Sequence, residues 1–231
     1  MRRLLVHVEG QTEESFVNEL LAPHLYQYGY SQVSARLFGN ARNRNRRGGI
    51  RSWDSAREDI ARHLKADTGC IATTMVDYYA LPKSGVREWP GRATADALPF
   101  ASKASTVEAA LLNDMAIALG ASQASQRLIP YVMMHEFEGL LFSDCAAFAK
   151  GIGQQRMRLP LQNIRDAFDS PEHINDSPQT APSKRVIALV PGYSKPLHGV
   201  IAALEIGLES IRGQCGHFDG WLVRLERAGD C

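Results

Sequence analysis

Carboxylates follow apolar runs at three points of this sequence. One run covers residues 3–8, a second 70–76 and a third 127–134. The acids that follow them are Glu9, Glu13, Asp77, Glu136 and Glu138. Short apolar runs that end in an acid are typical of buried parallel strands, whose carboxyl ends bind ligands in open α/β sheets. A carboxylate there is costly without a cation, so we expect a divalent metal ion.

The spacing of these acids predicts which of them meet. Glu9 and Asp77 come together if their strands are neighbours. Glu136 and Glu138 are two residues apart, so in an extended segment both face one ion, whereas in a helix only one can serve. The alternative interpretation is that these two glutamates simply begin a helix at its favourable end.

Basic residues gather in two places that can contact phosphate. Segment 39–51 carries five arginines among asparagines and glycines. It is a solvated linker or a phosphate-binding loop, and the arginine density in a chain of net charge +1 favours the loop. We expect phosphate contacts from Arg42, Arg44, Arg46 and Arg47. A second group follows two later turns, where it either binds phosphate or pairs with the acids: Lys184, Arg185, Lys195 and His198.

The elements that position these residues follow from periodicity. We predict strands over 3–8, 32–38, 70–79 and 127–134, with His7 packed in the core rather than binding a ligand. Helices are predicted over 14–28, capped by Thr12, and over 53–65 and 105–119, with an irregular excursion over 80–104. Past residue 144 the segments are short and helical: 145–150, 160–168, 183–189, 197–212 and 217–227. The chain therefore divides into an α/β core, 1–144, and a helical C-terminal extension, 145–231, packed on it.

Composition narrows the class of protein. With 231 residues and 45% hydrophobic content, the chain can form one α/β domain with an appendage. Its four cysteines lack C-x-x-C spacing, which makes a zinc site improbable. We find no signal-peptide pattern and no apolar stretch of membrane-spanning length. We expect a cytoplasmic protein without membrane contact, and a homodimer.

The order of these motifs resembles that of a known fold. Residues 9–13 (EGQTE) resemble the E-G-x-T/S-E/D motif of TOPRIM domains, and Asp77 looks like the first acid of their D-x-D motif. The whole chain is similar to a TOPRIM-like bacterial family catalogued as domain of unknown function 4276, through blocks at 9–14, 74–82, 135–144, 174–185 and 191–199. The resemblance implies a TOPRIM-like (Rossmann-like), mostly parallel sheet flanked by helices.

The resemblance also implies a chemistry. TOPRIM nucleases of the overcoming-lysogenization-defect group use carboxylates to hold Mg²⁺ or Mn²⁺ for phosphodiester cleavage. By position Glu9 is a metal ligand or general acid/base, and Asp77 and Glu13 are ligands. Tyr79 stands where the second acid of D-x-D belongs. Either one metal binds, or Glu136 and Glu138 substitute, and Glu136 joins Glu9 and Asp77 as a catalytic candidate.

Three functions remain open on this basis. The first is a metal-dependent nuclease acting on DNA or RNA, in anti-phage defence beside an ABC-type ATPase, as the resemblance implies. The second is a non-catalytic TOPRIM-like subunit that binds nucleic acid or an ATPase partner. The third is a metal-dependent phosphotransfer enzyme acting on a small molecule, which a deep closed pocket would favour.

Overall fold

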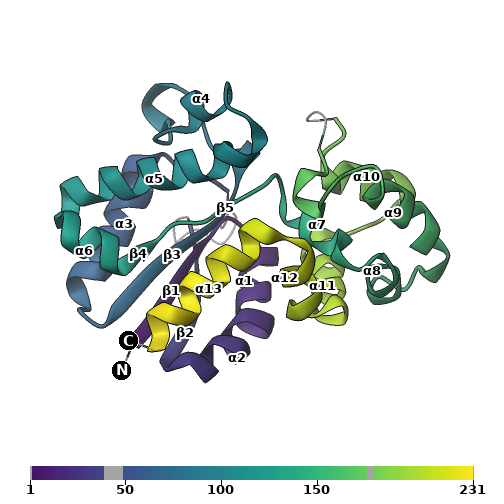
Figure 1. Ribbon diagram of the computed structural model, residues 1–231, viewed down its shortest axis with the longest axis horizontal. Coiled ribbons are helices and arrows are strands. Elements are labelled where there is room, and N and C mark those ends of the chain that lie inside the picture. Colours follow the sequence, from purple (N-terminus) through teal and green to yellow (C-terminus); the bar gives the residue numbers. More distant parts are fainter. Residues whose placement is uncertain (1, 39–48, 176–178, 231) are drawn as a thin grey trace.

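A computed structural model of the protein describes residues 2–38, 49–175 and 179–230. The four arginines predicted to contact phosphate from segment 39–51 lie outside the described residues; they are Arg42, Arg44, Arg46 and Arg47. Two lobes are visible in Figure 1, a sheet covered by helices and a group of short helices beside it.

The sheet is built from parallel pairings. Its strands are β1 (Arg2–Val8), β2 (Tyr30–Leu37), β3 (Cys70–Asp77), β4 (Leu128–Ile129) and β5 (Val132–Met133). The order is β2-β1-β3-β4, and β5 also pairs with β3. β1 and β3 are parallel neighbours with Val8 opposite Met75, so both strands end at the same edge. The predicted mostly parallel sheet is confirmed.

The third predicted strand, 127–134, is wrong as one continuous element. It forms two strands of two residues each, separated by Pro130 and Tyr131. Proline has no amide hydrogen to donate to a ladder, which ends β4. At Tyr131 the Thr74 hydroxyl replaces the backbone partner. It accepts a hydrogen bond from the Tyr131 amide at 3.0 Å and donates one to the Tyr131 carbonyl at 2.9 Å.

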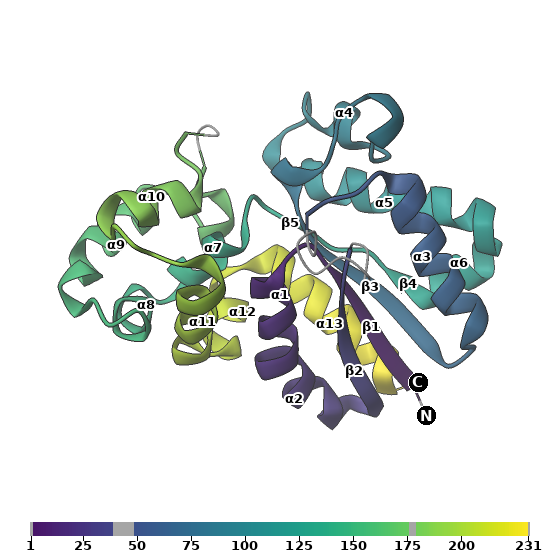
Figure 2. The ribbon, with the colours of Figure 1, turned by 180° about the vertical axis from the view of Figure 1, so that it is seen from behind.

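Helices cover both faces of the sheet (Figures 1 and 2). One face carries α3 (Trp53–Ala66), α5 (Phe100–Leu119) and α6 (Ala121–Arg127). The other carries α1 (Gln11–Phe16), α2 (Ala22–Leu25) and α13 (Gly216–Asp230). Strand β3 serves both layers, because Ile71 and Met75 join one buried cluster and Ala72 and Val76 the other.

The first helical segment accommodates a proline by changing its winding. Between α1 and α2 lies a π-helical turn, η1 (Val17–Leu21), and η2 (Tyr26–Tyr28) follows α2 and ends at Gly29 with φ 81°. Pro23 therefore sits in the first turn of α2, where its missing amide costs little. Thr12 does not cap the segment: the N-cap is Gly10, and Thr12 is buried inside α1.

The predicted excursion 80–104 contains short helices. They are η4 (Tyr78–Ala80), η5 (Gly85–Arg87) and α4 (Arg92–Ala95), and α5 already begins at Phe100. The excursion is anchored by the buried Trp89, whose indole nitrogen donates to the Arg51 carbonyl at 2.8 Å.

The second lobe follows β5. It contains α7 (Phe137–Leu140), η6 (Leu141–Ser143), α8 (Cys145–Gly151), η7 (Gln155–Met157), α9 (Arg158–Arg165), η8 (Pro171–His173), α10 (Pro182–Leu189), η9 (Lys195–Gly199), α11 (Val200–Ile206) and α12 (Leu208–Gln214). The single helix predicted over 197–212 is wrong, because Gly207 with φ 79° separates α11 from α12. A left-handed residue cannot continue an α-helix.

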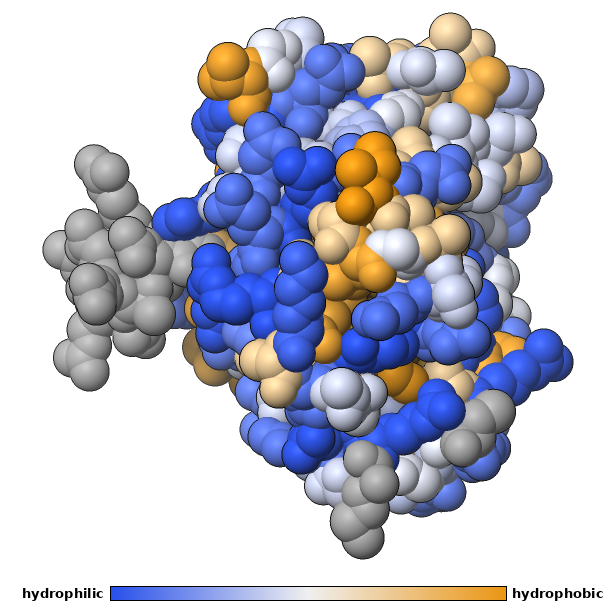
Figure 3. Space-filling view, turned by 90° about the vertical axis from the view of Figure 1, so that its left-hand side faces the viewer, coloured by the Kyte–Doolittle hydropathy of each residue, from blue (hydrophilic) through white to orange (hydrophobic). Residues whose placement is uncertain are grey.

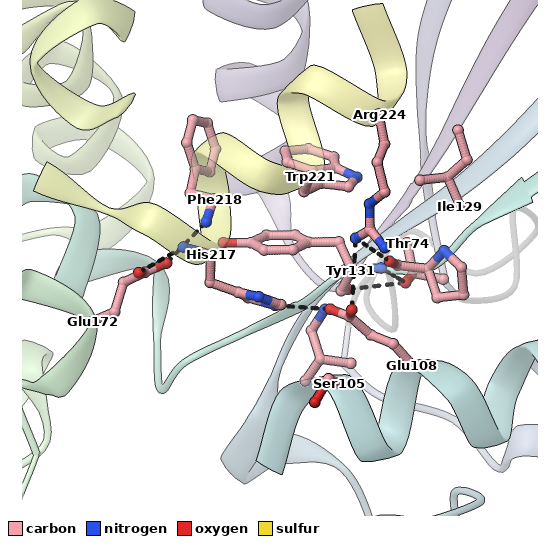
Figure 4. A network of polar contacts seen from close by, with 12 residues as sticks. Thr74, Ser105, Glu108, Ile129, Tyr131, Glu172, His217, Phe218, Trp221 and Arg224 are labelled. Carbon is pink, nitrogen blue, oxygen red and sulfur yellow. Dashed lines mark hydrogen bonds and ion pairs between the residues drawn. The ribbon is translucent and has the colours of Figure 1, made fainter. Parts of the chain in front are cut away.

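The last helix leaves this lobe and returns to the sheet. In α13 the side chains of Phe218, Trp221, Leu222 and Leu225 are buried. The Trp221 indole nitrogen donates to Thr73 Oγ1 of β3 at 2.8 Å. The Tyr131 ring stacks on Trp221 with centroids 4.4 Å apart (Figure 4). His7 of β1 is fully buried, as predicted for a core histidine, and burial lowers its pKa to about 3.

The side of the molecule seen in Figure 3 is mainly hydrophilic, with a narrow band of hydrophobic residues. A cavity of about 750 Å³ opens between α3 and α5, and Ile117, 81% exposed, is among its lining residues. None of the lining residues is a predicted site residue. Within the described residues, no helix combines the length and apolar character needed to cross a membrane.

Candidate functional site

The carboxyl ends of the strands bring the five predicted acids into one region. Glu9 follows β1, Asp77 ends β3, and Glu13 lies in the first turn of α1. Charge interactions couple Asp77 to Glu9, Glu13 and Glu138, and couple Glu9 to Glu136. We call these five residues the acid cluster.

One lysine enters the acid cluster from the second lobe. Lys195, at the start of η9, places its Nζ 3.0 Å from Glu138 Oε2 and 3.7 Å from Glu136 Oε1. Of the two roles that the sequence left open for Lys195, the contacts show pairing with acids. Glu138 is the more buried partner, with only 1% of its side chain exposed.

Glu136 and Glu138 converge although the chain changes conformation between them. Glu136 is extended (φ −143°, ψ 157°) and forms the N-cap of α7, whereas Glu138 lies in the first helical turn. The amide of Ser183, in the first turn of α10, donates to Glu136 Oε2 at 3.0 Å. The other oxygen, Glu136 Oε1, is directed at Lys195. Glu136 is therefore extended and Glu138 helical, so each of the two predicted conformations of this segment applies to one glutamate.

Burial dominates the electrostatics of the acid cluster. It raises the pKa of Glu9 to about 7, with help from Glu13, and it raises the pKa of Glu138 to about 7. Burial also raises the pKa of Glu13, and that of Asp77 well above its usual range. For Lys195 burial opposes the charged form, but Glu138 and Glu136 outweigh it and raise the pKa. One ammonium group therefore faces more carboxyl groups than it can neutralise.

Three of these acids keep an unsatisfied oxygen. Glu9 Oε2, Asp77 Oδ1 and Glu138 Oε1 are buried, and no described residue forms a hydrogen bond with them. Hard divalent cations prefer such oxygens, so the donor set fits Mg²⁺ or Mn²⁺. However, among the described residues, no three Asp, Glu, His or Cys side chains are already arranged so that they could hold a metal ion. Binding an ion therefore requires the carboxylates to move toward one another.

Gly10 leaves room for one of those carboxylates. A Cβ atom at this position would lie 3.0 Å from Glu13 Oε2. The glycine of the EGQTE segment therefore lets the Glu13 carboxylate lie close against the turn after β1.

The other predicted cations take different positions. Lys184 is exposed in the first turn of α10, beside the Ser183 amide that binds Glu136. The Arg185 guanidinium donates to the Thr180 carbonyl at 2.7 Å and lies over the Phe168 ring. His198 Nδ1 accepts from the Ser194 amide at 2.8 Å. Lys195 thus differs from these three residues in that its described contacts are with Glu138 and Glu136 of the acid cluster.

Aromatic residues beside the acids are the part that sequence reasoning missed. Tyr79, considered only as a replaced acid, stacks on His135 with centroids 4.9 Å apart. Phe100 and His173 continue the group from distant segments. The one local signal was a tyrosine two residues beyond a strand-end aspartate, since the other rings are joined by tertiary contacts alone.

The fold and this site define an α/β protein with a carboxylate-rich site at the carboxyl edge of a parallel sheet. The chain belongs to the family described as Domain of unknown function (DUF4276), whose model matches residues 8–226. Neither the curated proteins nor the solved structures contained a match.

Proposed function

We propose that this protein is a divalent-metal-dependent nuclease that hydrolyses phosphodiester bonds of DNA or RNA. The observation that carries the proposal is a set of three buried carboxylate oxygens, on Glu9, Asp77 and Glu138, with which no residue that the structure describes forms a hydrogen bond. Uncompensated buried charge is expensive, and such perturbed groups cluster at functional sites.

The order of the motifs supports the same chemistry. The EGQTE segment follows β1 and Asp77 ends the neighbouring parallel strand, as the TOPRIM resemblance requires. Tyr79 departs from that pattern. Glu138 supports the substitution that we propose, because its charge interacts with that of Asp77.

Each residue then has a role. The five carboxylates of the acid cluster would hold Mg²⁺ or Mn²⁺, which supplies positive charge to the phosphodiester as negative charge develops on it. Glu9, with a pKa of about 7, is suited to exchange a proton near neutral pH. The Lys195 side chain is 41% exposed and can meet a phosphate oxygen from the solvent side.

The proposal extends to context that follows from the resemblance. We place the nuclease in the bacterial cytoplasm as a homodimer, working beside an ABC-type ATPase in defence against phage. Copurification with such an ATPase from the native host, and the mass of the purified protein in solution, test these parts separately.

One observation favours a second function, a non-catalytic TOPRIM-like subunit that binds nucleic acid or an ATPase partner. Lys195 already pairs with Glu138 and Glu136, and the described acids form no ready-made metal site. In such a subunit the lysine would replace the metal permanently.

Calorimetry with Mn²⁺ separates the two functions. We expect binding in the micromolar range for the wild type, lost in Glu9→Ala and in Asp77→Ala, and retained in the matched control Glu19→Ala on the exposed face of η1. Circular dichroism checks that each variant is folded. Cleavage of single-stranded and duplex DNA and of RNA with Mg²⁺ or Mn²⁺ follows. If the folded wild type binds no Mn²⁺, with or without nucleic acid, the nuclease proposal is overturned and the non-catalytic subunit is the function that remains.

A further inference from the structure

An exposed tyrosine lies beside the acid cluster. Tyr79 belongs to η4, which starts directly after Asp77. One face of its ring stacks on His135, with centroids 4.9 Å apart and an interplanar angle of 16°. Tyr79 is nevertheless 41% exposed. Part of its surface is therefore open to solvent at a position two residues beyond Asp77.

The ring beneath Tyr79 is itself packed inside the protein. His135 is only 5% exposed. Phe100, the first residue of α5, lies 5.6 Å from His135 between ring centroids. Phe100 in turn meets His173 of η8 edge-on at 4.0 Å. Three separate segments thus support the Tyr79 ring.

A cation lies near the same rings. Lys103 lies in the first turn of α5, three residues after Phe100. Within residues 2–38, 49–175 and 179–230, Lys103 forms no ion pair. An aromatic face with a cation close by matches the alternation of bases and phosphates along a single strand.

We propose that Tyr79, supported by His135, Phe100 and His173, is a stacking platform for an unpaired base of a single-stranded nucleic acid that enters the acid cluster. The proposal rests on the proposed nuclease function and specifies its substrate class. Bases inside a duplex are stacked on one another and cannot offer a free face to Tyr79, whereas unpaired bases can. The platform therefore selects single strands, or unpaired sites in a duplex.

Fluorescence anisotropy tests this selection. Labelled single-stranded and duplex oligonucleotides of one sequence are titrated with the full chain in the presence of Ca²⁺. We expect the wild type to prefer the single strand and Tyr79→Ala to lose roughly tenfold in single-strand affinity, with duplex affinity unchanged. Tyr79→Trp should restore the affinity, since the larger ring still stacks. Tyr26→Ala is the matched control, because Tyr26 is 50% exposed on η2, away from the acids.

A photo-crosslink adds a positional readout. A single strand containing 5-iodouracil should crosslink to Tyr79 in the wild type, and mass spectrometry identifies the modified peptide.

The outcomes separate this inference from the proposed function. If the wild type binds Mn²⁺ but Tyr79→Ala keeps full single-strand affinity, the platform is wrong and the metal site stands. Tyr79-dependent binding of single strands without any Mn²⁺ binding supports the platform and overturns the nuclease. A wild type that binds no oligonucleotide overturns both.

Discussion

His217 Nε2 lies 2.8 Å from Glu108 Oε1, and this contact joins the first turn of α13 to the middle of α5 (Figure 4). The two residues are separated by 109 positions and lie on helices that cover opposite faces of the sheet. Glu108 also accepts from the Val132 amide at 2.9 Å, so it links β5 to both helices. At the same end of α13, Glu172 accepts from the amides of His217 and Phe218.

This pair predicts a pH-dependent stability. Burial disfavours charged His217, but the bond to Glu108 outweighs it and raises the pKa. A raised pKa contributes stability that is fully present below the unfolded value of 6.5 and lost as pH rises through the folded value. His217→Gln should therefore cost about 1–2 kcal/mol in free energy of unfolding at about pH 6 and less at about pH 9. Urea denaturation of His217→Gln, Glu108→Gln and the double variant measures the coupling, and equal losses at both pH values would contradict the prediction.

Replacing Lys195, which enters the acid cluster, should leave the negative charge of the cluster uncompensated. Lys195→Met leaves the buried Glu138 carboxyl group without its cation, which should cost about 2 kcal/mol at about pH 8. At about pH 5 the cost should shrink, because Glu138, with a pKa of about 7, is then protonated. Lys150→Met is the control, since its pair with Glu205 is exposed and should contribute under about 0.5 kcal/mol. A loss independent of pH would mean that packing of the Lys195 stem, not charge, matters.

Neutralising Glu9 should stabilise the protein and remove the proposed nuclease activity. Its pKa of about 7 exceeds the ordinary 4.5, so its contribution is full below 4.5 and is lost as pH rises to about 7. Glu9→Gln should match the wild type at about pH 5 and exceed it by about 1–2 kcal/mol at about pH 8. Thermal and urea unfolding at both pH values measure the difference, with Glu19→Gln as an exposed control. Destabilisation of Glu9→Gln at the higher pH would show that the charge is compensated.

The packing of α13 against the first helical segment gives a prediction without charge. A Cβ at Gly229 would lie 2.1 Å from the Tyr28 carbonyl oxygen and 2.6 Å from the Tyr30 ring. Gly229→Ala should therefore cost at least about 2 kcal/mol, since backbone must shift. Gly220→Ala in the same helix meets nothing within 4 Å and should stabilise by about 0.5–1 kcal/mol. Chemical denaturation of the two variants side by side checks the contrast.

The local pattern of apolar residues was enough to predict much of the fold. Apolar runs located β1 and β3, and the parallel arrangement of two neighbouring strands is enough to bring Glu9 and Asp77 to one edge. The last helix and its buried face were also predictable from periodicity. Two predicted elements were interrupted by a single residue that the hydrophobic periodicity does not reveal. Pro130 divides the third strand, and Gly207 divides the helix predicted over 197–212.

By itself, the sequence determined which residues are acidic, aromatic or apolar, and which of them end a strand, because these properties depend on near neighbours in the chain. Tertiary structure alone decided that Lys195 pairs with Glu138, that His135 supports Tyr79, and that α13 returns to the sheet. These contacts join segments separated by tens of residues or more. They depend on how whole elements pack, and no local spacing encodes that packing.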